Sequence, residues 1–203
     1  MDSIKKNTVL LTALAFFACG IANAQIRMGA GMYMGLPMGT EATEQEFGFG
    51  IGAGFSAEYM FNVSIGVALN IANVSFSSEV MVTDPVSGIS TPSRSTLKVV
   101  PINISWNYYF MPGKDFNAYA SLSYGMNMNT LSAVIEGFPD LEGYSLDFCP
   151  RIGFNYMLSE HFGLDFSAGY NFNSFLPKNA IDPEEGDFSY LPINIGVVYA
   201  LFE

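Results

Sequence analysis

The sequence predicts an all-β protein, an eight-stranded antiparallel up-and-down transmembrane β-barrel that follows a secretory signal. Three observations lead to this prediction. Apolar residues alternate with small or polar ones through most of the chain, the connections between these stretches are short and long in turn, and one face of each stretch is far more aromatic than the other. Period-two alternation is typical of a strand with two different faces.

A cleavable signal is predicted at the N-terminus. Two lysines precede an uncharged apolar run over residues 8–21, and Ala22-Asn23-Ala24 then provides a small-x-small cleavage site. The run is short for a transmembrane helix, which takes roughly 20 residues. We therefore divide the chain into a signal peptide, residues 1–24, and one barrel domain, residues 25–203.

Composition narrows the class of protein further. The net charge of −11 and the pI of about 4.3 argue against nucleic acid as a partner, because a phosphate backbone needs a basic face. Mean hydropathy is +0.27, with the apolar residues dispersed along the strands, as in membrane barrels. Signal cleavage would leave Cys149 as the only cysteine, so no intramolecular disulfide is expected.

The first four predicted strands are residues 26–36, 47–61, 63 to about 74, and 97–110. In the second, every odd position is apolar and most even positions are glycine, serine or glutamate. Each is long enough to cross a bilayer, which takes roughly 9–11 residues of tilted strand. The apolar positions of the other three are Met28, Ala30, Met32, Met34 and Leu36; Val63, Ile65, Val67, Leu69 and Ile71; and Val100, Ile102, Ile104, Trp106, Tyr108 and Phe110.

The last four predicted strands are residues 116–129, 144–158, 162–175 and 188–202. They keep the same alternation. Their apolar positions are Ala118, Ala120, Leu122, Tyr124, Met126 and Met128; Phe148, Ile152, Phe154, Tyr156 and Leu158; Phe162, Leu164, Phe166, Ala168, Tyr170 and Phe172; and Leu191, Ile193, Ile195, Val197, Tyr199 and Leu201.

The connections predict the orientation of the barrel. Short ones lie around Asn62, at 111–114 and at 159–161; long ones span 37–46, 75–96, 130–143 and 174–187. Outer-membrane barrels place short turns in the periplasm and long loops outside, so we expect periplasmic termini. The long connections are strongly acidic, which indicates a solvated outer rim. Their acids are Glu41, Glu44, Glu46, Glu79, Asp84, Glu136, Asp140, Glu142, Asp182, Glu184, Glu185 and Asp187.

The apolar face is expected to meet lipid. The opposite face is mostly glycine, serine, asparagine and alanine, unlike a water-exposed surface, and the apolar face has too many large aromatics to fit inside eight strands. Lys98 interrupts the apolar face only near a long connection, where its ammonium can reach lipid phosphate. Aromatics near the short turns predict an interfacial girdle: Tyr59, Phe61, Trp106, Tyr108, Phe110, Tyr156, Phe162 and Tyr199.

A few charged residues share the inward face. Unpaired charges in a narrow interior are costly, so we expect Arg27 to pair with Glu58 and Arg151 with an acid. The two interpretations are a structural plug and a solute-gating network. The inward charges are Arg27, Glu58, Asp147, Arg151 and Asp165.

No catalytic, cofactor-binding or metal-binding residues are predicted. The sole histidine, His161, falls in a short turn beside Ser159 and Glu160, on the periplasmic side, whereas barrel enzymes generally work on the outer half. Cys149 has no candidate base, so we interpret it as interior packing. The acidic segment 182–187 has oxygen ligands for weak divalent-cation binding but lacks the spacing of a dedicated calcium loop.

A weak internal repeat joins two strands. Val100-Pro101-Ile102-Asn103-Ile104 returns as Leu191-Pro192-Ile193-Asn194-Ile195. Two interpretations remain open: a duplicated four-strand ancestor, and chance convergence of strands with similar burial.

After the signal, the chain resembles the small eight-stranded outer-membrane barrels of the OmpX and OmpA transmembrane-domain type, most closely the β-barrel domain family common in Bacteroidota. Asn194-x-Gly196-x-x-Tyr199-x-Leu201 looks like the family's assembly signal, although Glu203 follows the usual final aromatic. No OmpA-type peptidoglycan-binding domain is expected after the last strand.

The resemblance implies a non-enzymatic, monomeric outer-membrane protein with a role in envelope integrity or in surface recognition and adhesion. The implied partners are outer-membrane lipid and lipopolysaccharide, the barrel-assembly machinery and an unknown extracellular ligand at the loops. The alternatives are a narrow solute channel and an accessory barrel of an outer-membrane transport or secretion complex.

Overall fold

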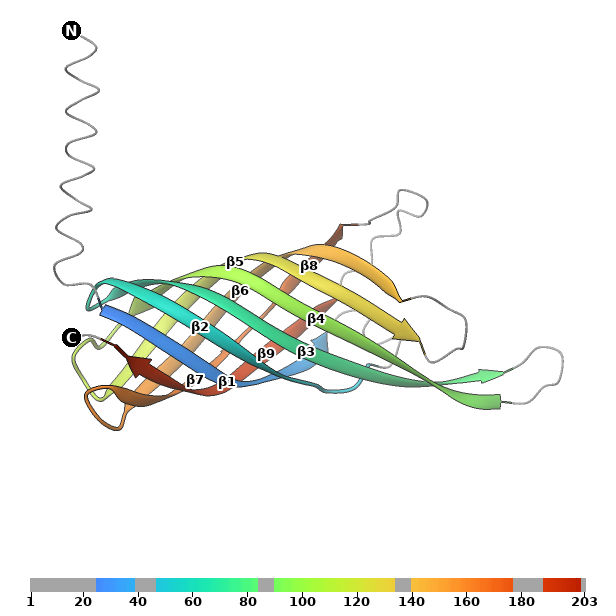
Figure 1. Cartoon of the computed structure of the whole chain (residues 1–203), viewed down its shortest axis with the longest axis horizontal. Helices are drawn as coiled ribbons and strands as arrows, with labels where there is room; N and C mark the ends of the chain where they lie inside the picture. Colours follow the sequence, from blue (N-terminus) through green and yellow to red (C-terminus); the bar gives the residue numbers. More distant parts are fainter. Residues whose placement is uncertain (1–24, 39–46, 84–89, 134–139, 177–187, 202–203) are drawn as a thin grey trace, which may run out of the picture.

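The computed structural model describes residues 25–38, 47–83, 90–133, 140–176 and 188–201. Every strand pairs antiparallel with its neighbours in one sheet (Figure 1). The strands are β1 (Gln25–Met38), β2 (Gly50–Asn62), β3 (Ile65–Thr83), β4 (Ser90–Tyr109), β5 (Phe116–Ala133), β6 (Leu141–Met157), β7 (Phe162–Gly169), β8 (Phe172–Leu176) and β9 (Ser189–Ala200).

The sheet closes on itself. β1 pairs with both β2 and β9, and β5 pairs with β6, so the ring has no open side. β7 and β8 both pair with β6 and occupy one position in the wall, which makes the nine strands eight positions around the barrel. The predicted eight-stranded up-and-down barrel is therefore confirmed.

One end of the barrel carries the tight turns. They lie at residues 63–64, 110–115 and 158–161, as predicted, and the first is fixed by Asn62, whose Oδ1 accepts hydrogen bonds from the N–H groups of Ser64 and Ile65 at 2.8 and 2.9 Å. The N–H of Leu201 donates to the carbonyl of Ile26 at 2.8 Å, so the first and last strands also meet at this end. We call it the short-turn end and the opposite one the long-loop end.

The prediction that residues 75–96 form a loop is mostly wrong. β3 and β4 stay paired from Ser75 and Lys98 out to Thr83 and Ser90, and Figure 1 shows this hairpin continuing past the other strands. The two strands satisfy each other's backbone groups beyond the rim, so they need no third strand. β5 and β6 extend in the same way, to Ala133 and from Leu141. The signal, residues 1–24, lies outside the described residues.

The seventh predicted strand, residues 162–175, is interrupted between β7 and β8. In register, Pro150 of β6 lies opposite Tyr170, and Pro192 of β9 lies opposite Gly169. Proline has no N–H to donate, so the ladder loses a bond on both sides of the same point. Tyr170 still donates its N–H to the carbonyl of Pro150 at 3.1 Å, and the strand direction continues into β8.

The apolar face points outward, as predicted. Trp106 is 56% exposed and Ile152 is 71% exposed, whereas the inward polar residues Asn103 and Ser105 are both 2% exposed. Aromatic side chains gather near the tight turns and contact one another there, with centroid distances of 5.1 Å for Tyr59–Phe61 and 5.2 Å for Tyr108–Phe110. Within the described ranges there is no helix with the length and apolar character of a membrane span.

We predict that the folded protein migrates differently in SDS before and after boiling. A closed barrel offers detergent no free edge from which to unzip, so the unboiled protein should keep its compact form. Gel electrophoresis of refolded protein, with a boiled aliquot as control, measures this. Identical migration of both samples, together with solubility in plain buffer, would contradict the membrane barrel.

Candidate functional site

The lumen is the candidate site, and it is divided into layers along the barrel axis. Toward the long-loop end lies a cluster that we call the apolar plug. Next comes a polar cavity of about 70 Å³, the central chamber, and then a layer of Met60, Tyr109 and Tyr119, the floor. The apolar plug consists of Tyr33, Ala72, Val74, Phe76, Leu97, Val99, Phe188 and Tyr190.

The apolar plug is several side-chain layers thick. Phe76 is fully buried, and its ring packs edge to face on Phe188 and Tyr190 at centroid distances of 5.1 and 5.4 Å. β3 contributes three successive inward positions, Ala72, Val74 and Phe76, which span about 13 Å along the strand. Hydrocarbon thus fills the lumen beside these strands, whereas β5 and β6 contribute the buried and hydrogen-bonded Asn129 and Ser145 near the same level. The predicted third strand ended near Val74, so sequence reasoning missed this continuation.

Two glycines make room for Phe76. Gly35 of β1 and Gly50 of β2 are directly paired, and the Phe76 ring lies over both. A Cβ at Gly35 would lie 2.6 Å from Cζ of Phe76, and one at Gly50 would collide with the same ring. The ring therefore reaches from β3 across β2 to β1 only because neither neighbour has a side chain.

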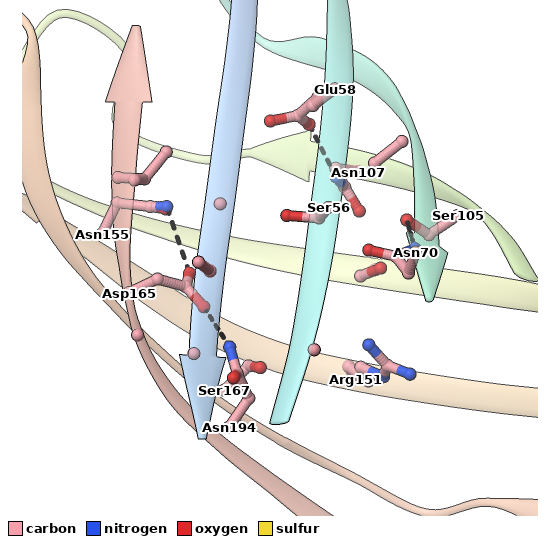
Figure 2. A pocket seen from close by; sticks show the side chains of 18 of the residues that line it. Ser56, Glu58, Asn70, Ser105, Asn107, Arg151, Asn155, Asp165, Ser167 and Asn194 are labelled. Carbon is pink, nitrogen blue, oxygen red and sulfur yellow. Dashed lines mark hydrogen bonds between the residues drawn. The ribbon is translucent and has the colours of Figure 1, made fainter. Parts of the chain in front are cut away.

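Asp165 is the best-bound carboxylate of the central chamber (Figure 2). Its Oδ1 accepts hydrogen bonds from the hydroxyl of Tyr119 at 2.9 Å and from Asn155 Nδ2 at 3.3 Å. Its Oδ2 accepts one from Asn194 Nδ2 at 2.7 Å. Tyr119 crosses β6 over Gly153 to make its bond, since a Cβ there would lie 2.6 Å from its ring.

Glu58 is held in the same manner. It accepts hydrogen bonds from Asn107 Nδ2 at 2.6 Å and from the hydroxyl of Tyr109 at 2.8 Å. Glu58 belongs to β2 and its two donors to β4, so the carboxylate crosses β3, where Gly66 leaves space beneath it. These buried bonds replace the water that the charge loses.

Asp147 is a third carboxylate of the lumen; it is buried, lies outside the lining of the chamber, and its partners include a residue of the internal repeat. It accepts hydrogen bonds from Asn103 Nδ2, at 2.6 Å, and from Asn171 Nδ2. Asn103 and Asn194 occupy the same place in the two copies of the repeat, and each donates to an inward aspartate. The repeat in the sequence pointed to these two asparagines, although it did not indicate which aspartates they bind.

The expected ion pairs are not the arrangement found. Arg27 is in register with Glu58, but its Nε donates to Gln25 Oε1 at 3.1 Å and its guanidinium lies 5.1 Å from the ring centroid of Tyr109. Arg151 Nε lies 3.3 Å from Cys149 Sγ. In the described part of the lumen, amides and tyrosines hold the carboxylates, and no arginine is paired with one.

The floor separates the chamber from a wider cavity of about 570 Å³, which we call the vestibule. The rings of Tyr109 and Tyr119 lie 5.4 Å apart, and each hydroxyl bonds a carboxylate of the chamber. The vestibule is formed at the short-turn end by Arg27 and the turns around Lys114 and Glu160.

The described residues form no catalytic arrangement around the sole histidine. His161 is exposed in a tight turn, with its ring 6.1 Å from that of Tyr199, and Ser159 Oγ accepts a hydrogen bond from the N–H of Phe162. No three metal-ligating side chains gather within the described strands and turns. Of the predicted acidic rim, Glu79, Asp140 and Glu142 are exposed and the others, including segment 182–187, lie outside the described residues.

Comparisons with known proteins agree on the fold. A family model described as "Outer membrane protein beta-barrel domain" matches residues 10–200. A comparison with curated protein sequences found no match. Similar solved structures include the outer membrane protein OprG from Pseudomonas aeruginosa, with a TM-score of 0.59 and 19% identity over 89% of this chain and 97% of that one.

Two further structures are similar at 14% identity. Neisserial surface protein A matches with a TM-score of 0.54, covering 87% of this chain and 96% of that one. Ail, the attachment invasion locus protein of Yersinia pestis, solved with the heparin analogue sucrose octasulfate, matches with a TM-score of 0.53, covering 88% and 97%. At these identities the comparison shows a shared fold.

We predict strong energetic coupling between Glu58 and Tyr109. In a cycle of Glu58→Gln and Tyr109→Phe, the coupling energy should be about 1–2 kcal/mol, because the buried hydroxyl donates directly to the carboxylate. The comparison cycle, Glu58→Gln with Arg27→Met, should give a smaller coupling energy, because Arg27 contacts the ring of Tyr109 and makes no hydrogen bond to Glu58. Urea unfolding in detergent, followed by fluorescence of the single tryptophan, measures both. A larger coupling energy for Glu58–Arg27 than for Glu58–Tyr109 would indicate that Glu58 pairs directly with Arg27.

Proposed function

The chain belongs to the outer membrane protein β-barrel domain family, and from this premise we propose that it is a non-enzymatic barrel that presents its long-loop end to the cell exterior without forming an open pore. The observation that carries the proposal is the apolar plug. A conducting lumen needs a wide and continuous path of water, and the fully buried Phe76 and Val99 fill much of the lumen at their level, beside the buried amide of Asn129. Eight strands enclose a space that side chains already fill.

The proposed orientation follows from the two ends. The short-turn end would face the periplasm and the long-loop end the exterior, as is general for such barrels. Exposed Lys98, above the apolar face of β4, would then meet phosphates of lipid or lipopolysaccharide in the outer leaflet. We propose that β9, which ends in the assembly-type pattern, is the strand presented to the insertion machinery, and that the protein is a monomer.

Surface recognition is the role that we favour for the outer end. The β3–β4 hairpin carries strand structure beyond the barrel rim, and such a rigid projection suits contact with another surface. Neisserial surface protein A is named for its place on the cell, and Ail binds a polyanionic heparin analogue. The exposed acids Glu79, Asp140 and Glu142 would repel a polyanion, so we propose a neutral or cationic ligand here.

The alternative is a narrow solute channel, and two polar cavities in series, the vestibule and the central chamber, favour it. They stop at the apolar plug, which is why we rank the channel second. An enzymatic role finds no support around His161, whose neighbouring serine is engaged in the turn.

We predict that refolded wild-type protein in a planar lipid bilayer shows no sustained ohmic conductance. The three β3 layers of the plug cover about 13 Å of tilted strand, or about 10 Å along the barrel axis, and so long an apolar constriction strips ions of much of their hydration. Heat-modifiable migration of the same preparation in vesicles serves as the control for insertion. A steady open-pore current in most insertions would contradict the proposal and establish the channel.

A further inference from the structure

The two barriers that close the central chamber differ in thickness. Toward the long loops, β3 alone supplies three apolar layers, Ala72, Val74 and Phe76. Toward the short turns, the floor is one layer, to which β2, β4 and β5 contribute one residue each. A single layer of side chains opens by rotamer changes, whereas several interlocked layers must move together.

The floor is also where the two cavities nearly meet. Asn155 lines both the central chamber and the vestibule. Next to it, the hydroxyl of Tyr119 is tied to Asp165, which also accepts a hydrogen bond from Asn155 itself. On the other side of the floor, Arg27 lies over the ring of Tyr109 from the vestibule. At Asn155, a single side chain therefore borders both cavities.

The chamber presents hydrogen-bonding groups that the protein leaves unused. Asn155 and Asn194 both donate their amide nitrogens to Asp165, and the Oδ1 atoms of both are buried and accept no hydrogen bond from the described residues. Asn155 is only 5% exposed. Arg151 also lines the cavity, apart from the carboxylates (Figure 2). Buried acceptors of this kind are normally satisfied by water.

We propose that the central chamber is a binding site for water and small hydrogen-bonding solutes, entered from the vestibule through the Tyr109–Tyr119 floor and closed toward the long loops by the apolar plug. The volume of about 70 Å³ accommodates several molecules of water, since one needs about 10–15 Å³ by the same measure. Such water would join Arg151 to the free oxygens of Asn155 and Asn194. The inference rests on the sealed plug of the proposed function.

A cysteine placed in the chamber tests the route of entry. Ser56 lines the chamber, so Ser56→Cys, made in a Cys149→Ser background, reports access to a small water-soluble methanethiosulfonate reagent. Tyr119→Phe removes the hydroxyl that ties the floor to Asp165 while keeping the ring. The matched control is Tyr190→Phe, which removes a hydroxyl from the apolar plug, where it accepts a hydrogen bond from Asn171 at 3.3 Å.

The expected result is labelling that becomes about tenfold faster with Tyr119→Phe and changes less than about twofold with Tyr190→Phe, because one lost hydrogen bond of this kind shifts a local opening by about that factor. Phe76→Ala and the milder Val99→Ala, which thin the plug, should also leave the rate within about twofold. Heat-modifiable migration verifies that each variant is folded.

Faster labelling in the plug variants but not in Tyr119→Phe would overturn the proposed route. Labelling that is absent from every folded variant, Tyr119→Ala included, would overturn the hydrated chamber itself. The proposed function is tested separately, by the bilayer conductance of the wild type. A steady current would show an open pore whatever the labelling rates of the variants are.

Discussion

An eight-stranded barrel encloses a narrow lumen, and this narrowness decides how its inward side chains are arranged. A large inward side chain has no room to point at the axis, so it lies along the wall and crosses a neighbouring strand. In three places the neighbour that it crosses has a glycine there. Phe76 lies over the Gly35–Gly50 pair, and the same arrangement recurs with Glu58 over Gly66 and Tyr119 over Gly153.

These crossings make the interior polar network possible. Because Glu58 and Tyr119 reach over a strand, each bonds a residue two strands away, which cross-links the wall from inside. Amide and hydroxyl donors thus compensate the buried carboxylates without an arginine, and the arginines are left to other contacts. Such cross-links restrain the strands relative to one another, which suits the proposed presentation of the long-loop end to the exterior.

The sequence determined which face of each strand points outward, because lipid and a packed lumen demand different residues at alternate positions. The tight turns were equally predictable, from their length and from residues such as Asn62. Lumen contacts were not, since Asn103 and Asp147 are 44 residues apart and their meeting depends on register. The interruption at Tyr170 could have been found, because Pro150 and Pro192 lie in the two flanking strands.

If the ring of Phe76 packs against Gly50 because glycine has no side chain, the two positions should be energetically coupled. Unfolding free energies of single and double variants measure this coupling. Gly50→Ala should cost about 2–3 kcal/mol of unfolding free energy in the wild type and less than about 1 kcal/mol when Phe76 is already alanine. Gly48→Ala is the matched control and should cost little, since the nearest atom to its Cβ would be Ser77 O at 3.3 Å. An equal cost of Gly50→Ala with and without the Phe76 ring would contradict the account.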